Sequence, residues 1–216
     1  MKIVLAFEGM DGAGKSSLAS FTRRLCQDSN QSCTLVGRRG TYADPVVARL
    51  TKLLQEGATQ LTPHADISVR VAREYQRAYL AASAPADVVV LDRFVLSILS
   101  LARIQGHEIK PVHGLLKDVA ARAHLFATVF VHCPFETASE RVQERTAGLL
   151  SRGQKSQRFL RRLAELLEDD FERGLLTGQQ WPVDNSHSLE EAQEQLAAYL
   201  LPHLRKDAGQ PTAPAK

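Results

Sequence analysis

Residues 9–16 of this 216-residue chain read G-M-D-G-A-G-K-S, a complete G-x-x-x-x-G-K-[ST] phosphate-binding loop. An apolar run at residues 3–7 precedes the loop, and a helical pattern begins at Ser16. Such a loop needs a buried strand before it and a helix start after it, because its glycines turn successive N–H groups inward and the helix N-terminus adds a favourable dipole. The context therefore favours a nucleotide-phosphate site over the alternative, a glycine-rich turn that holds a structural anion.

The residue types within the loop predict what each would bind. Lys15 supplies a mobile ammonium group for the β- and γ-phosphates, and the Ser16 hydroxyl is placed for Mg²⁺. The cofactors expected from the loop are thus ATP and Mg²⁺. The predicted ATP-binding residues of the loop are Gly9, Asp11, Gly12, Ala13, Gly14, Lys15, Ser16 and Ser17.

The rest of the chain alternates short apolar runs with helical patterns. The expected strands are residues 3–7, 32–36, 87–91, 127–132 and 181–183. The expected helices are residues 16–28, 45–56, 66–82, 95–104, 113–123, a stretch from 134, 158–174 and 189–204. Short apolar strands separated by helices are typical of a parallel sheet with helices on both faces. We therefore expect an α/β fold of three layers in a single domain, residues 1–205, with a disordered tail at 206–216 that is small, polar and proline-bearing.

Composition limits the partners and the compartment. The formal net charge of +3 is too small to indicate nucleic-acid binding. No apolar run approaches the ~20 residues of a membrane span, and no signal sequence is recognisable at the start. The three cysteines, Cys26, Cys33 and Cys133, show no metal-ligand spacing. We expect a protein of the reducing cytoplasm that binds neither nucleic acid nor membrane.

A second motif with candidate functional residues, Asp92-Arg93-Phe94, directly follows the strand expected at residues 87–91. In open α/β sheets, ligands bind at the carboxyl ends of the strands, so this segment should converge with the phosphate loop. An acid in this position orders Mg²⁺ in phosphate-loop enzymes, and Arg93 could bind a phosphate with two hydrogen bonds. The alternative is an Asp–Arg pair that caps the next helix.

Several motifs together resemble the thymidylate kinases, a family of nucleoside monophosphate kinases. The family loop F-E-G-x-[DE]-G-x-G-K-[ST]-[ST] stands here as F-E-G-M-D-G-A-G-K-S-S, and the family D-R-Y-x-x-S stands as D-R-F-V-L-S from Asp92. The segments V-F-V-H-C-P-F-E-T-A-S-E-R-V, from Val129, and V-D-N-S-H-S-L-E-E-A, from Val183, are similar to later parts of the family. The resemblance covers nearly the whole chain up to the tail, in order, and implies a P-loop kinase fold with a helical lid at about residues 140–160 and a homodimer.

The resemblance also implies roles for individual residues. Lys15, Ser16 and the loop amides would hold the ATP phosphates, while Ser16 and Asp92 would serve Mg²⁺. Arg93 would bind the acceptor phosphate, and Asp11 would contact the acceptor sugar. Arg39 stands where the family has a second acceptor-phosphate arginine, with Arg38 as a rival, and Arg73 matches an arginine that reaches the acceptor base.

The lid region is rich in arginine, and a cation is needed to balance the charge on the transferring phosphoryl group. Because the loop has Gly12 and Ala13 where some family members carry an arginine, the resemblance points to the lid as the source. The candidates are Arg145, Arg152 and Arg158, while Arg141 could instead pack on the adenine. Arg161 and Arg162 fit a solvated helix face better.

The positions that read thymine in the family are not kept. Ala102 replaces the glutamine that hydrogen-bonds thymine, Leu101 replaces the tyrosine, and the stacking aromatic falls near Val69. We favour an ATP-dependent kinase of a nucleoside monophosphate, dTMP or a related nucleotide. One alternative is a kinase of the same fold that phosphorylates a hydroxyl of a sugar, aminoglycoside or nucleoside in specialised metabolism, with Asp11, Glu8 and Asp92 as the available acids. A non-catalytic nucleotide-binding regulator is disfavoured, because the phosphate-handling residues are intact.

Overall fold

A five-stranded, all-parallel sheet forms the centre of the computed structural model, which describes residues 2–37, 45–56, 61–107, 121–146, 157–174 and 178–204. The strand order is β2-β3-β1-β4-β5, so β1, which leads into the phosphate loop, lies in the middle. The strands are β1 (Ile3–Glu8), β2 (Cys33–Val36), β3 (Val88–Asp92), β4 (Leu125–His132) and β5 (Gln179–Asp184).

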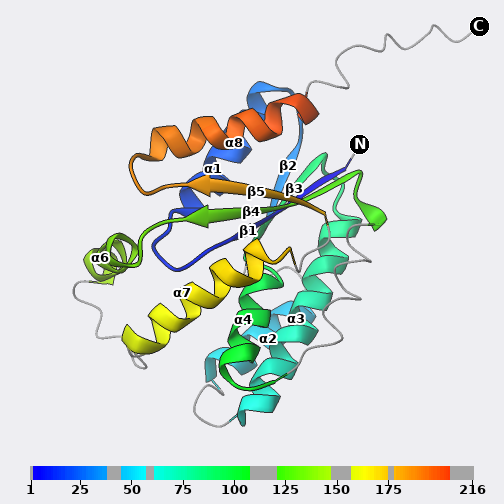
Figure 1. The fold of residues 1–216 in the computed structure, drawn as a ribbon. Helices are drawn as coiled ribbons and strands as arrows, with labels where there is room; N and C mark the ends of the chain where they lie inside the picture. Colours follow the sequence, from blue (N-terminus) through cyan, green and yellow to red (C-terminus); the bar gives the residue numbers. More distant parts are fainter. Residues whose placement is uncertain are drawn as a thin grey trace, which may run out of the picture.

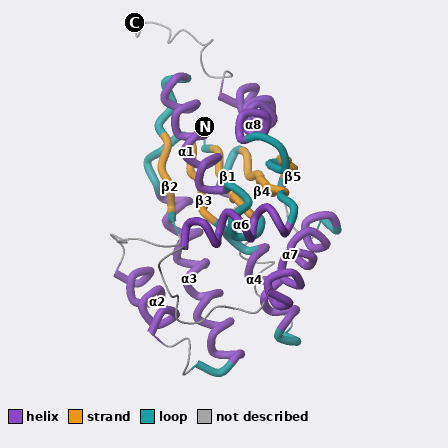
Figure 2. Tube along the Cα trace, turned by 90° about the vertical axis from the view of Figure 1, so that its left-hand side faces the viewer, coloured by secondary structure: helices purple, strands orange, loops and turns teal. Residues whose placement is uncertain are grey.

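Helices cover both faces of the sheet, which confirms the predicted α/β architecture (Figure 1). One face carries α1 (Lys15–Asp28) and α8 (Leu189–Leu204). The other carries α3 (Pro63–Ser83), α4 (Leu96–Ile104) and α7 (Gln157–Glu172), with α2 (Pro45–Glu56) packed on α3. Helix α6 (Phe135–Thr146) lies beyond the carboxyl ends of the strands and stands in front when the molecule is viewed from that end (Figure 2).

The central strand explains why its sequence is continuously apolar. All six residues of β1 are buried, with Leu5 and Phe7 in the core beneath α1 and α8, and Val4 and Ala6 in the core beneath α3, α4 and α7. A parallel strand covered on both faces needs apolar side chains in both directions. The same double burial holds the loop that follows β1 rigidly at the middle of the sheet's carboxyl edge.

The elements expected from the sequence are found within a few residues wherever the structure describes them. Helix α3 begins earlier than expected because Thr62 caps it, its hydroxyl accepting a hydrogen bond from the Ala65 N–H, and Pro63 follows at the first helical position. Strand β5 is longer than expected and contains Pro182, which an edge strand tolerates. Most of the helix expected at 113–123, the middle of the expected lid and the expected tail at 206–216 lie outside the described residues. No helix in the described ranges is long and apolar enough to cross a membrane.

Candidate active site

The phosphate loop is a left-handed turn packed between two distant segments. Gly12 and Gly14 have φ angles of 92° and 99°, in the region that favours glycine. A Cβ on Gly12 would lie 2.0 Å from the carbonyl oxygen of Ala138 in α6, and one on Gly14 would lie 2.3 Å from Nδ2 of Asn185. Conformation and space therefore both require glycine at these positions.

Asn185, just after β5, anchors the loop from the side of the last strand. Its Nδ2 donates a hydrogen bond of 2.7 Å to the carbonyl oxygen of Ala13, and its own N–H donates to the carbonyl oxygen of His132 at 2.9 Å. Asn185 is 2% exposed. Asn185 is a functional residue that the sequence motifs do not single out. The signal was a polar residue directly after a strand, at the edge of the sheet where ligands bind.

Lys15 lies almost fully buried beneath the loop. Its Nζ donates a 2.5 Å hydrogen bond to the carbonyl oxygen of Met10. Burial and, to a smaller extent, the positive charge of Arg93 lower the pKa of Lys15 to about 7, against the opposing effect of Asp11, Asp92 and Glu8. Anionic phosphates beside this amine would stabilise its charged form. The positive charge of Lys15 is therefore poorly stabilised until an anion binds beside it.

Arg93, at the end of β3, connects the phosphate loop to α4. Its Nη2 pairs with the carboxylate of Asp11, and its Nη1 donates to the hydroxyl of Ser97 at 3.0 Å. The expected convergence of strand end and loop is therefore present. The alternative in which Asp92 and Arg93 cap the next helix as a pair does not fit, because Arg93 pairs with Asp11 and a different acid binds the start of α4.

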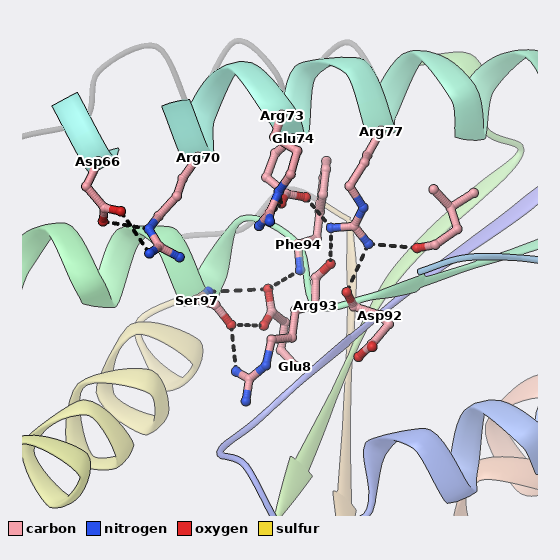
Figure 3. Close-up of polar contacts among 11 residues, drawn as sticks. Glu8, Asp66, Arg70, Arg73, Glu74, Arg77, Asp92, Arg93, Phe94 and Ser97 are labelled. Carbon is pink, nitrogen blue, oxygen red and sulfur yellow. Dashed lines mark hydrogen bonds and ion pairs between the residues drawn. The ribbon is translucent and has the colours of Figure 1, made fainter. Parts of the chain in front are cut away.

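That acid is Glu8, the last residue of β1, which is 1% exposed. Its carboxylate accepts hydrogen bonds from the N–H of Phe94 at 2.8 Å, from the N–H of Ser97 at 3.3 Å and from the Ser97 hydroxyl at 2.5 Å (Figure 3). Glu8 thus binds the first turn of α4 and holds the segment that carries Arg93. A buried acid engaged in three hydrogen bonds is a poor candidate for the general base that a hydroxyl acceptor would need.

Helix α3 places its arginines differently from the sequence expectation. Arg73, expected at the acceptor base, is 4% exposed and donates to Oε1 of Glu74, from Nε at 3.2 Å and from Nη2 at 3.0 Å. Arg70, about one turn earlier, lines the pocket instead. Its guanidinium is held by Asp66 through hydrogen bonds of 2.7 and 2.9 Å (Figure 3).

One pocket of about 590 Å³ unites these elements. Its lining combines the phosphate loop, the end of β3 and four helices: Asp11, Gly12, Gly14, Lys15, Ser16, Ser17, Arg70, Asp92, Arg93, Ser97, Leu101, Val142, Arg145 and Leu163. Phosphate-handling residues and a partly apolar end therefore share one cavity. This is the arrangement that a donor nucleotide and a second small substrate require.

Comparison with known proteins agrees with this geometry. The family model for thymidylate kinase matches residues 7–196, which is most of the chain. The chain belongs to the thymidylate kinase family. Members of this family are ATP-dependent kinases of nucleoside monophosphates, and this chain is an enzyme of that kind.

The similarity to individual thymidylate kinases is distant but extends over much of the chain. A probable thymidylate kinase of Archaeoglobus fulgidus is 24% identical over 200 residues, which cover 90% of this chain and 92% of that protein. The thymidylate kinase of Brachyspira hyodysenteriae is 28% identical over 149 residues, covering 66% and 68%. That of Xanthomonas campestris pv. campestris is 28% identical over 146 residues, covering 66% of this chain and 61% of the relative.

Of the positions that depart from the thymidylate kinase pattern, Leu101 lines the pocket. Leu101 and Ala102 both belong to a small core cluster with Ile67, and Ala102 is not part of the pocket lining. Leu163 adds a second apolar side chain to the lining. Arg70 is therefore the charged side chain that α3 contributes to the pocket among the described residues.

The arginines expected in the lid region differ in whether they line the pocket. Arg145 of α6 lines the pocket, and its Nε donates to the carbonyl oxygen of Arg141 at 2.9 Å. The guanidinium of Arg141 lies 3.5 Å from the carbonyl oxygen of Asn185. Arg158 is exposed on α7 and does not line the pocket. Arg161 pairs with Glu136 and Arg162 with Glu165 on the surface, whereas Arg38, Arg39 and Arg152 lie outside the described residues.

Proposed function

We propose that this thymidylate kinase family member transfers the γ-phosphoryl group of ATP to the phosphate of dTMP or a related nucleotide whose base carries a carbonyl group. The observation that supports this most directly is the contact between Arg93 and Asp11, which joins the donor loop to the acceptor side of one pocket. The oxygen of an acceptor phosphate is already anionic, so the reaction needs positioning and charge neutralisation rather than a strong base.

On the donor side, Lys15 and the backbone N–H groups of residues 9–17 would bind the ATP phosphates. Bringing negative charge to Lys15 would restore its proton near neutral pH, because burial is what lowers its pKa. Arg141 and Asn185 border the loop on the side of β5, where the nucleoside part of ATP would extend. Arg145 is the lid arginine best placed to reach the transferring phosphoryl group, since it lines the pocket. Arg152 and Arg158 remain candidates for the same role.

Ser16 and Asp92 fit a magnesium ion. Both line the pocket, and the Asp92 carboxylate makes no hydrogen bond or ion pair with another side chain in the described ranges. Oxygen ligands, including a carboxylate, are what Mg²⁺ prefers, and it usually binds through one or two protein groups together with the phosphates of a nucleotide. A bound Mg²⁺ would neutralise charge on the phosphates and orient them.

On the acceptor side, Arg93 would bind the acceptor phosphate, with Arg39 as a second candidate, and Asp11 would contact the sugar. For the base we propose Arg70 in place of Arg73, because Arg70 lines the pocket and Arg73 is engaged with Glu74. An arginine offers donors and no acceptor, so it favours a base edge that presents a carbonyl oxygen or ring nitrogen.

We further propose that two copies pair through the surface formed by β2, α2 and α3. Five large apolar side chains are exposed on these elements: Leu35, Val46, Leu53, Tyr75 and Tyr79. Exposed apolar side chains gathered on neighbouring elements are typical of interfaces. Light scattering should give twice the chain mass for the wild type, and Leu53→Glu with Tyr79→Glu should reduce it to the mass of one chain.

An ADP-release assay with dTMP, dUMP, dGMP, dAMP (whose base lacks a carbonyl group), thymidine and an amino sugar tests the function. We expect turnover of dTMP or another carbonyl-bearing nucleotide, and loss of that turnover in Lys15→Ala. Activity restricted to thymidine or the amino sugar would overturn the proposal, because the acceptor would then be a hydroxyl. Near-normal turnover in Lys15→Ala would overturn the donor assignment.

A further inference from the structure

Helix α3 buries a cation that does not line the pocket. Arg77 is 0% exposed, and its charge is balanced by Glu74, which is also fully buried. Taking a guanidinium out of water costs several kcal/mol, and a well-packed apolar group of similar volume is often equally stable. Stability alone therefore does not account for an arginine at this position.

The contacts of Arg77 are directed at the backbone of the site. Nη1 donates to the carbonyl oxygen of Arg93 at 2.9 Å, and Nη2 donates to those of Asp92 at 2.9 Å and Val36 at 2.7 Å (Figure 3). Val36 and Asp92 are the last residues of β2 and β3. One guanidinium thus links the carboxyl ends of two neighbouring strands to the backbone of Arg93, the arginine proposed to bind the acceptor phosphate.

The segment that Arg77 binds is conformationally strained. Arg93 has a φ of 56°, a left-handed conformation that costs a non-glycine residue on the order of 1–3 kcal/mol. The peptide groups around it are fixed by buried partners: the Arg93 N–H donates to the Phe7 carbonyl oxygen at 2.9 Å, and the Phe94 N–H donates to Glu8 at 2.8 Å. The Arg93 carbonyl oxygen, bound by Arg77, completes the set.

We infer that Arg77 is a positioning residue for phosphoryl transfer: it holds Arg93 in its left-handed conformation, and Asp92 beside it, so that both side chains point into the pocket. The inference rests on the proposed function. Helix α3 would then have two separate roles. Arg70 lines the pocket and reads the base, and Arg77, two turns later, acts through the backbone of the site. Glu74 pairs with Arg73 through Oε1 and with Arg77 through Oε2, which offsets part of the cost of burying the two positive charges.

The test variant is Arg77→Met. Glu74 keeps its ion pair with Arg73, so the loss of Arg77 leaves no buried carboxylate unpaired. We expect the acceptor KM to rise and kcat to fall, by roughly 10- to 100-fold in kcat/KM, because a small displacement of positioned groups is enough for such a loss. The Kd for ATP measured without Mg²⁺ should change less than about twofold, since Arg77 does not contact the phosphate loop and Asp92 would act only through the metal. Arg77→Lys should recover part of the activity, because one ammonium nitrogen cannot reproduce the planar fork of donors.

Lys2→Met is the matched control. Lys2 is also a cation that donates to three backbone carbonyl oxygens, those of Ala81, Ala82 and Ala84, but at the opposite edge of the sheet. Its loss should lower thermal stability without changing the acceptor KM.

Amide hydrogen exchange of the protein without substrates gives a readout besides activity. In Arg77→Met, residues 92–97 should lose protection while residues 9–17 keep theirs. An unchanged acceptor KM, or exchange that increases equally throughout the chain, would show that Arg77 is merely structural. If the wild type phosphorylates no nucleotide, the proposed function fails, and the exchange result still decides whether Arg77 holds this segment.

Discussion

The Arg93 guanidinium donates to the carboxylate of Asp11, which brings the end of β3 into direct contact with the phosphate loop. Asp11 is 68% exposed and Arg93 11%, so an incoming ligand can reach the pair. Because exposed ion pairs contribute little to stability, the contact matters more as a link between the two halves of the pocket.

We expect Arg93→Ala to raise the acceptor KM and to lower kcat, together by at least roughly tenfold, because a charge-assisted bond to the acceptor phosphate is lost. Steady-state kinetics with ATP held saturating would measure both constants. Arg161→Ala is the control, since Arg161 pairs with Glu136 on the surface. An acceptor KM unchanged in Arg93→Ala would contradict the assignment.

Lys15→Met should abolish turnover and stabilise the protein in the absence of nucleotide. The Lys15 pKa is about 7 in the fold against 10.5 in the unfolded chain, so the unfolded state binds more protons between these values. The wild type should therefore gain stability as the pH rises from 7 towards 10. We expect Lys15→Met to be more stable at pH 6, by up to a few kcal/mol, with a gap that narrows at high pH. Denaturant unfolding at several pH values measures this, and a gap independent of pH would contradict it.

Arg70→Leu should change which acceptor is used while sparing ATP. Removing a charged donor from a carbonyl oxygen costs about 1.5–3 kcal/mol, or roughly 10- to 100-fold in kcat/KM for acceptors such as dTMP. An acceptor that makes no bond to Arg70 should be affected far less. Asp66→Asn tests the same site indirectly, because it weakens the contact that orients Arg70. Equal losses on every nucleotide in Arg70→Leu would argue against base reading.

Asn185→Ala should weaken ATP binding. The change removes the bond to the Ala13 carbonyl oxygen and leaves that buried oxygen without this donor, which costs about 1–3 kcal/mol. We expect a higher ATP KM and a lower melting temperature, with the acceptor KM less affected. Gln195→Ala is a suitable control, because Gln195 accepts from the Asp184 N–H on the exposed side of the same turn. A higher acceptor KM with an unchanged ATP KM would contradict the anchoring role.

Much of this fold follows from short-range pattern. The glycine spacing of the loop, the apolar run of β1 and the acid at the end of β3 each depend on neighbouring residues, so they indicate a parallel sheet with a phosphate site at its carboxyl edge. The phosphate loop and the end of β3 lie together, as expected, because parallel strands end at a common edge of the sheet.

The partners of the buried polar residues depended on tertiary structure. Arg70 and Arg73 are three residues apart on one helix, but one lines the pocket and the other lies against Glu74. Glu8, Arg77 and Asn185 bind partners that lie far away in the sequence. Asn185 and Ala13 are 172 residues apart, and no local pattern encodes such a contact. The reason is physical: a buried charge or amide must be satisfied by whatever the packed elements bring beside it, and that is decided only when helices and sheet come together.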